Sequence, residues 1–156
     1  MTRLRGKFMF GEKPIVGSRL IKLDSKGRFV LPMFTGVENN EEGFAIIRIS
    51  PIEGVVCLQV QKADRLRKRI AELEELRKSI TDLAKSEETY QKLVELCFDT
   101  VALDTSVDGQ RRMLLPAKIR KDLFGEQTEI ACQGAYDSLY IFPNENALDE
   151  FNSKRK

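Results

Sequence analysis

Residues 24–32 read DSKGRFVLP, and residues 108–116 read DGQRRMLLP. Both stretches follow the pattern Asp-x-x-x-Arg-apolar-apolar-Leu-Pro, and they lie 84 residues apart. This repetition predicts that the chain contains two copies of one small unit. A half of about 70 to 80 residues is near the lower limit for an independent core, so we expect the two halves to share one core.

The composition is that of a charge-rich globular protein, with 42% hydrophobic and 32% charged residues in a chain of 156. No apolar run approaches the roughly 20 residues of a membrane helix, and the first residues lack the apolar core of a signal peptide. We therefore expect a cytoplasmic protein without membrane contact. The three cysteines (Cys57, Cys97 and Cys132) are far apart and lie among apolar residues, so we expect buried side chains rather than disulfides or metal ligands.

The chain contains no histidine. This absence excludes Ser-His and Cys-His catalysis and removes the commonest transition-metal ligand. The glycines are scattered singly, so the sequence has no glycine-rich phosphate loop. We expect a protein that is not an enzyme and that uses no cofactor, metal or small-molecule substrate.

Positive charge is concentrated at the start of the chain. Residues 1–32 contain eight basic and two acidic residues, whereas the whole chain has a formal net charge of only +2. Such a segment attracts polyanions, with nucleic acid the first candidate and an anionic membrane surface the second. For residues 3–13 taken alone, a solvated N-terminal segment is the alternative.

The first motif predicts a β-hairpin between residues 19–23 and 29–31. Asp24 begins the turn, where its side chain can accept a backbone N–H two residues on, and Gly27 supplies the positive φ of a type I turn with a bulge. Arg28 then leaves a rigid turn at a fixed angle, which lowers the entropy lost when it binds a partner.

The second motif places Gly109 directly after Asp108 and has Arg111 where the first motif has Gly27. Because a residue other than glycine resists positive φ, we expect a different turn here, of type II′ and shaped by Gly109. This turn gains a second cation, Arg111 beside Arg112. We expect the first turn to dominate binding, because it is the regular one and lies in the basic segment.

Further elements follow each motif. A short helix is expected over residues 117–124, ended by Gly125, and strands over 44–49, 55–60, 128–132 and 139–142. A last helix is expected over 144–151. Residues 63–97 lack proline and glycine and carry apolar residues at spacings of three and four, which predicts an amphipathic helix or helix pair. This connector either packs on the core or forms a dimerising coiled coil.

Two turn-displayed Asp-x-x-x-Arg motifs, each followed by an apolar strand and a proline, resemble the MraZ family within the AbrB-like swapped-hairpin DNA-binding proteins. The resemblance covers roughly residues 17–151 and is strongest at 23–28 and 108–123. It implies a β-rich α+β fold in which two tandem swapped-hairpin repeats form one pseudo-twofold composite domain. The expected segments are a basic N-terminal extension (1–16), the first repeat (17–62), a helical connector (63–98), the second repeat (99–151) and a basic C-terminal tail (152–156).

The resemblance also implies a function: a sequence-specific, nucleoid-associated transcriptional regulator of bacterial cell-division and cell-wall genes. Such a protein binds direct repeats in double-stranded promoter DNA as a ring-like homo-oligomer. The candidate DNA contacts are Arg28, Lys26, Arg112, Arg111, Lys22 and Arg19. Since a free carboxylate near phosphate is repulsive, the aspartates are expected to shape the turns. The expected turn-shaping residues are Asp24, Gly27, Asp108 and Gly109.

Two alternatives remain open. In the first, Arg28 and Arg112 only form ion pairs with the aspartates of their own motifs. In the second, the protein is an oligomeric scaffold or antitoxin-like interaction protein that docks through residues 63–97. One chain offers few cations, and each phosphate contact adds about 0.9 to the salt slope, so DNA binding requires several chains acting together.

Overall fold

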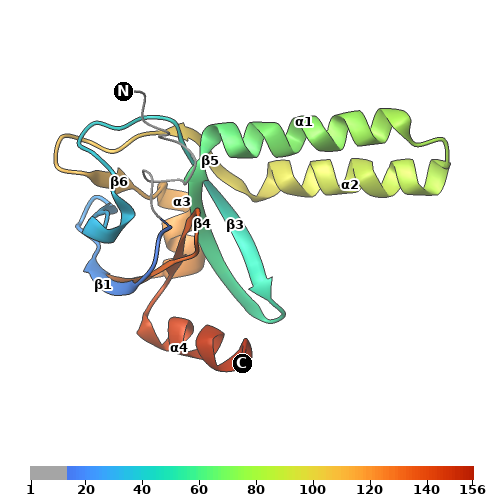
Figure 1. The fold of residues 1–156 in the computed structure, drawn as a ribbon. Coiled ribbons are helices and arrows are strands. Elements are labelled where there is room, and N and C mark those ends of the chain that lie inside the picture. Colours follow the sequence, from blue (N-terminus) through green and yellow to red (C-terminus); the bar gives the residue numbers. More distant parts are fainter. Residues whose placement is uncertain (1–13) are drawn as a thin grey trace.

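The computed structural model describes residues 14–156, and the predicted basic extension lies outside the described residues as far as residue 13. The described chain is a β-rich α+β domain, which confirms the predicted class (Figure 1). Its strands are β1 (Ser18–Lys22), β2 (Arg28–Val30), β3 (Phe44–Ile52), β4 (Val55–Lys62), β5 (Thr100–Thr105), β6 (Arg112–Leu114), β7 (Glu129–Gly134) and β8 (Leu139–Phe142). Its helices are α1 (Ala63–Ser79), α2 (Leu83–Asp99), α3 (Ala117–Ile119) and α4 (Glu145–Lys154), with short 3-10 and π-helical segments η1 (Met33–Thr35) and η2 (Arg120–Phe124).

Six of the described strands form one antiparallel sheet in the order β1-β7-β8-β4-β3-β5. The order is symmetric under exchange of the two halves, because β4 and β8 pair at the centre while β1 and β5 lie at the two edges. The first strand of each half therefore pairs with a strand of the other half: β1 with β7, and β5 with β3. Each half completes its sheet with a strand from the other.

The remaining two described strands form a separate ribbon, β2 with β6. The prediction of a local hairpin between residues 19–23 and 29–31 is therefore wrong in its pairing, since β1 and β2 each pair with the second half of the chain. The turn between them is still closed by two backbone bonds, from Asp24 N–H to the Arg28 carbonyl at 2.9 Å and from Gly27 N–H to the Asp24 carbonyl at 3.0 Å.

The core lies between the large sheet and the ribbon and draws on both halves. Phe29 and Met113, directly opposite each other in the ribbon, are almost completely buried and belong to the same cluster as Ile46 and Ile130 of the sheet. Burial of this kind contributes roughly 1.5 to 3 kcal/mol for each large apolar side chain. A smaller cluster holds α4 against the sheet through Leu148 and Phe151.

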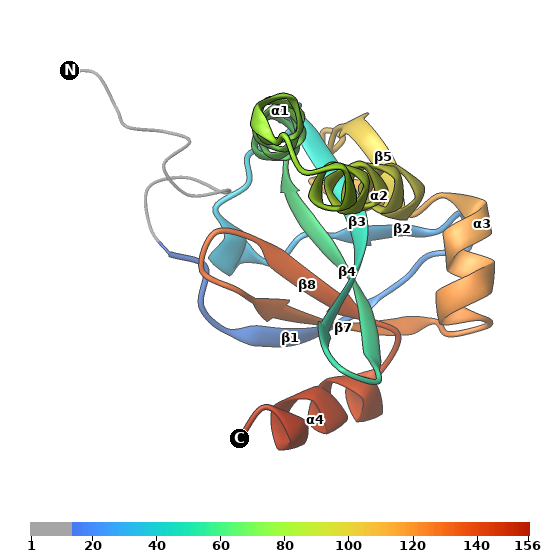
Figure 2. The same cartoon turned by 90° about the vertical axis from the view of Figure 1, so that its right-hand side faces the viewer.

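Residues 63–99 form an antiparallel helix pair that projects from the body as an arm (Figure 1). This confirms the helix-pair form of the prediction. The chain turns at Ile80–Asp82, where the Asp82 side chain accepts the backbone N–H groups of Ala84 and Lys85 and so caps α2. Figure 2 shows the arm end-on, on the opposite side of the sheet from α4.

The remaining helices and strands agree with the sequence in position. The predicted helix over 117–124 is present as α3 followed by π-helical η2, and Gly125 ends it with a φ of 59°. The four predicted later strands are present, and α4 runs on from the predicted helix as far as Lys154. In the described part of the chain, no helix is long and apolar enough to cross a membrane.

The cysteines divide into two kinds. Cys57 and Cys132 are buried, and burial raises the pKa of each thiol to about 12. The prediction that all three cysteines are buried is wrong for Cys97, which is exposed on α2. Its apolar neighbours in the sequence lie on several faces of the helix, because successive helical residues are turned by about 100°.

Candidate nucleic-acid interface

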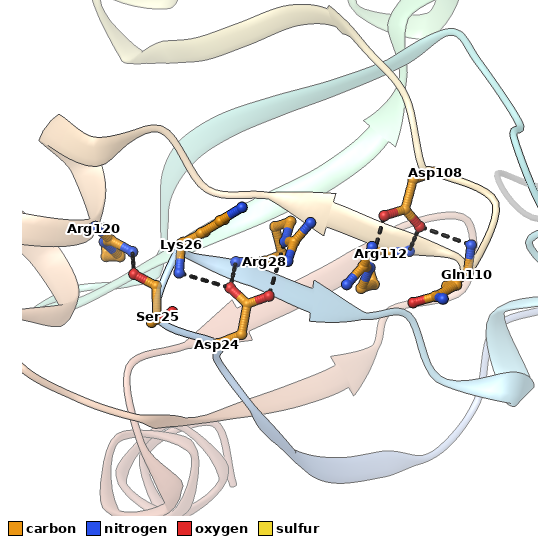
Figure 3. A network of polar contacts seen from close by, with 8 residues as sticks. All are labelled: Asp24, Ser25, Lys26, Arg28, Asp108, Gln110, Arg112 and Arg120. Carbon is orange, nitrogen blue, oxygen red and sulfur yellow. Dashed lines mark hydrogen bonds and ion pairs between the residues drawn. The ribbon is translucent and has the colours of Figure 1, made fainter.

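The first Asp-x-x-x-Arg segment is organised by one carboxylate. Oδ1 of Asp24 accepts the backbone N–H of Lys26 at 2.9 Å and that of Arg28 at 2.8 Å, while Oδ2 accepts Nε of Arg28 at 2.8 Å (Figure 3). Gly27 donates its N–H to the Asp24 carbonyl at 3.0 Å and has a φ of 84°. The aspartate thus fixes both the backbone of the turn and the direction of the arginine.

The second segment repeats this geometry. Oδ1 of Asp108 accepts the N–H groups of Gln110 and Arg112 at 2.8 and 2.9 Å, and Oδ2 accepts Nε of Arg112 at 2.7 Å. Arg111 donates its N–H to the Asp108 carbonyl at 3.0 Å, as Gly27 does in the first turn.

The prediction of a different, Gly109-shaped turn is therefore wrong. Arg111 itself takes a φ of 58°, whereas Gly109 has no positive φ. A left-handed residue with a side chain costs about 1 to 2 kcal/mol. The hydrogen bonds to Asp108 offset this cost, because they require the same backbone path whichever residue occupies the fourth position.

The two turns lie at opposite ends of the β2–β6 ribbon, with the two arginines between them (Figure 3). Phe29 pairs with Met113 at the centre, and the flanking bonds are related by exchange of the halves: Leu31 N–H to the Arg111 carbonyl at 3.0 Å, and Leu115 N–H to the Gly27 carbonyl at 2.8 Å. The ribbon therefore has a local twofold axis through its centre.

Alternation along the strands separates the two faces of the ribbon. Phe29 and Met113 face the core, so the outer face carries the remaining strand residues. In the register of the ribbon, Arg28 lies opposite Leu114 and Arg112 lies opposite Val30. Leu114 is 50% exposed and Val30 is 41% exposed, so the outer face combines two arginines with two uncovered apolar side chains. The outer-face residues are Arg28, Val30, Arg112 and Leu114.

Each arginine is held but retains binding capacity. The ion pairs with Asp24 and Asp108 engage Nε, so the pairing that the first alternative expects is present. A guanidinium has four further N–H donors on its two terminal nitrogens. Within residues 14–156 no hydrogen bond engages those terminal nitrogens of Arg28 or Arg112. The ion pair is therefore compatible with a second, external partner.

The aspartates remain ionised in this arrangement. The backbone N–H of Arg28 is the main cause that lowers the pKa of Asp24 below its ordinary 3.8, with further lowering from the Arg28 side chain and the Lys26 N–H. The backbone N–H of Arg112 lowers the pKa of Asp108 in the same way. Each turn is thus a fixed carboxylate–arginine pair at neutral pH.

The other predicted contacts are distributed more widely. Lys26 is exposed on the first turn, and Arg111 is half-buried on the second. Arg19 and Lys22 are exposed on β1, at the edge of the large sheet rather than on the ribbon. The structure thus places only Lys26, Arg28, Arg111 and Arg112 on the ribbon and its turns.

Two residues at the turns were not among the predicted contacts. Gln110 occupies the place in the second turn that Lys26 occupies in the first, which the offset of 84 residues already indicates. Arg120 of η2 reaches the first turn, where its Nη1 lies 3.4 Å from the Ser25 carbonyl oxygen (Figure 3). No sequence signal indicates this contact between residues 95 positions apart, since the repeat has an offset of 84.

A scan of protein-family models finds none that matches this chain, and no curated protein matches it either. Among residues 14–156 no group of three histidine, cysteine, aspartate or glutamate side chains is placed to hold a metal ion. The geometry of the ribbon and its turns is therefore the basis for the function proposed below.

Proposed function

We propose that this chain is a sequence-specific DNA-binding transcriptional regulator similar to the MraZ family, and that the β2–β6 ribbon meets DNA. One observation carries the proposal: Arg28 and Arg112 lie on the outer face of one two-stranded ribbon, each fixed by the same aspartate-centred turn. Exposed ion pairs stabilise a fold by little. Stability alone therefore does not account for two arginines held in matched orientations on an exposed ribbon.

The proposed architecture is a pair of tandem swapped-hairpin repeats. It is supported by the exchange of β1 and β5 between the halves and by the pairing of β2 with β6. The symmetric sheet order and the local twofold axis of the ribbon support it further.

The two-stranded form and the side-chain chemistry of the ribbon suit the major groove of DNA. That groove admits a two-stranded β-ribbon, and an arginine can donate two hydrogen bonds to O6 and N7 of guanine. The terminal nitrogens of Arg28 and Arg112 supply such donors, and Val30 or Leu114 can contact a thymine methyl group. Lys26 lies on the turn at one end of the ribbon, and its flexible side chain is better suited to binding a phosphate than to reading a base.

The proposal includes a homo-oligomer on direct repeats in promoter DNA, in the nucleoid and with the cell-division and cell-wall genes as the expected targets. One ribbon offers only a few cations, so a single chain would bind DNA weakly at physiological salt. Several ribbons on one assembly gain affinity from effective concentration, provided that the sites on DNA are spaced to match.

The test is a binding measurement with duplex DNA from immediately upstream of the protein's own gene. Fluorescence anisotropy should show tighter binding to this duplex than to a scrambled duplex of equal length, and the affinity for both should fall as salt rises. Equal, salt-independent and weak binding to both duplexes would contradict the proposal.

The second candidate function is an oligomeric scaffold or antitoxin-like interaction protein that docks through the arm. Two exposed apolar side chains favour it: Leu83 is 86% exposed and Phe98 is 83% exposed, both on α2. Substituting both with serine separates the two functions. On a DNA-binding regulator the double variant keeps its DNA affinity, whereas a docking protein loses its assembly or partner.

A further inference from the structure

Arg120 belongs to the second half of the chain but lies over the turn of the first half. A Cβ atom added to Gly27 would lie 2.6 Å from Nη1 of Arg120 and 3.2 Å from its Cδ. The same Nη1 lies 3.4 Å from the Ser25 carbonyl oxygen. The guanidinium is thus packed on the glycine, beside the turn that presents Lys26 (Figure 3).

The first turn and Arg120 together carry more positive charges than the carboxylates beside them neutralise. No carboxylate of residues 14–156 forms an ion pair with Arg120, whereas Arg28 is paired with Asp24. Arg120 therefore adds a third cation to a turn that already carries Lys26 and Arg28. Cations that gather without a matching number of anions repel each other, and a bound anion relieves that repulsion.

The second turn lacks such a residue. The position 84 residues before Arg120 is Gly36, which has no side chain. Asn40 lies there instead: its N–H donates to the Asp108 carbonyl at 3.0 Å, and its side-chain oxygen lies 3.6 Å from the Cβ position of Gly109. The two turns have the same backbone but differ in the residue that the opposite half brings to them.

We infer that Arg120 of the second half completes a phosphate-binding site on the first turn, together with Lys26 and Arg28, and that the second turn has no such site. The inference rests on the proposed function, since the phosphate is that of the DNA backbone. Guanidinium groups bind phosphate with charge-assisted hydrogen bonds, and the guanidinium nitrogens of Arg120 other than Nη1 have no hydrogen-bond partner within residues 14–156.

The experiment compares wild type with Arg120→Ala, Arg120→Gln and Arg120→Lys by fluorescence anisotropy. The probes are the duplex from upstream of the gene and a scrambled duplex, each measured over a range of NaCl concentrations. The matched control is Arg69→Ala, which removes an exposed arginine from the arm, away from the ribbon. Thermal unfolding and light scattering establish that each variant folds and assembles, and Arg120→Gln serves if Arg120→Ala does not fold.

Loss of one charge-assisted bond should weaken binding about tenfold or more in the Ala and Gln variants, on both duplexes alike. The salt slope should fall by about 0.9 for each bound chain, because one phosphate contact is lost. Arg120→Lys should keep the wild-type slope, and Arg69→Ala should match wild type in both quantities.

Two results would overturn the inference while leaving the proposed function in place. One is wild-type affinity and slope in Arg120→Ala. The other is weaker binding with an unchanged slope, which would make Arg120 only a support for the turn. Failure of the wild type to bind either duplex would overturn the proposed function and the inference together.

Discussion

The carboxylate of Asp24 receives three hydrogen bonds from its own turn, and that of Asp108 receives the same three. These bonds are stronger to the ionised carboxylate than to the protonated group, which is why each pKa lies below 3.8. The aspartate at the first position of each motif therefore determines both the backbone of the turn and the direction of the arginine side chain. This part of the site is local, and the sequence predicts it for the first turn; for the second turn it favours a Gly109-shaped turn, whereas Arg111 takes the left-handed conformation.

Substitution of both aspartates by asparagine should lower stability at neutral pH. Because the folded pKa of each aspartate is lowered, the stability it contributes is present above the unfolded pKa and is lost as pH falls through the folded pKa. The difference in thermal midpoint between wild type and the Asp24→Asn/Asp108→Asn variant should therefore be largest near pH 7. It should shrink progressively below pH 3.8. A difference that is constant from neutral to acidic pH would mean that the carboxylate charges do not hold the turns.

The left-handed residues of the two turns give a matched pair of substitutions. Arg111→Gly should leave stability unchanged or raise it by up to about 1 kcal/mol, because it removes backbone strain at a φ of 58° but adds freedom to the unfolded chain. Gly27→Ala should destabilise by about 1 to 2 kcal/mol, since it creates that strain at a φ of 84°. Its new Cβ must also displace Arg120. Chemical denaturation measures both, and a stabilising Gly27→Ala would contradict this reading of the turns.

At the scale of elements, the sequence predicts where the strands are but not how they pair. Residues 28–31 would alternate in the same way in a local hairpin as in a ribbon with β6, so the hydrophobic pattern cannot distinguish the two. The choice depends on contacts between residues 84 positions apart, such as Phe29 on Met113. The Arg120 contact was missed for the same reason. A repeat indicates that two units share a core, but does not say which strands they exchange.

In the arm, the Asp82 side chain caps the start of α2. Asp82 accepts two backbone N–H groups at the start of α2, at 2.9 and 3.2 Å, in a turn of three residues without glycine or proline. Asp82→Ala should cost about 1 kcal/mol, within the range of 0.5 to 2 seen for such caps. Hydrogen exchange should increase in the first turn of α2 and remain unchanged in the β2–β6 ribbon. Faster exchange in the ribbon would show that the arm and the interface are coupled.

At the scale of the whole molecule, the two halves present turns that share one set of backbone hydrogen bonds but differ in the side chains around them. The expectation that the first turn is more regular than the second is wrong, because both share one set of hydrogen bonds. The remaining differences are in side chains. The first turn has Lys26 where the second has Gln110, and it gains Arg120 where the second meets Asn40. The second turn has Arg111 in exchange for Gly27.

This difference still favours the first turn as the main DNA contact. Arg28→Ala should weaken binding to the upstream duplex by about 1 to 3 kcal/mol if the side chain reads a base, and this effect should be smaller on a scrambled duplex. Arg112→Ala should weaken binding less. The second turn has fewer cations to bind the neighbouring phosphates, so we expect Arg112 to be held less closely to DNA than Arg28. Both variants lose the same ion pair of their own turn, so each serves as the other's control for stability. Affinities measured in one salt, with light scattering to follow assembly, decide the order. If Arg112→Ala abolished binding with assembly intact while Arg28→Ala had no effect, the second turn would be the main DNA contact. The cations on the first turn would then bind a different partner.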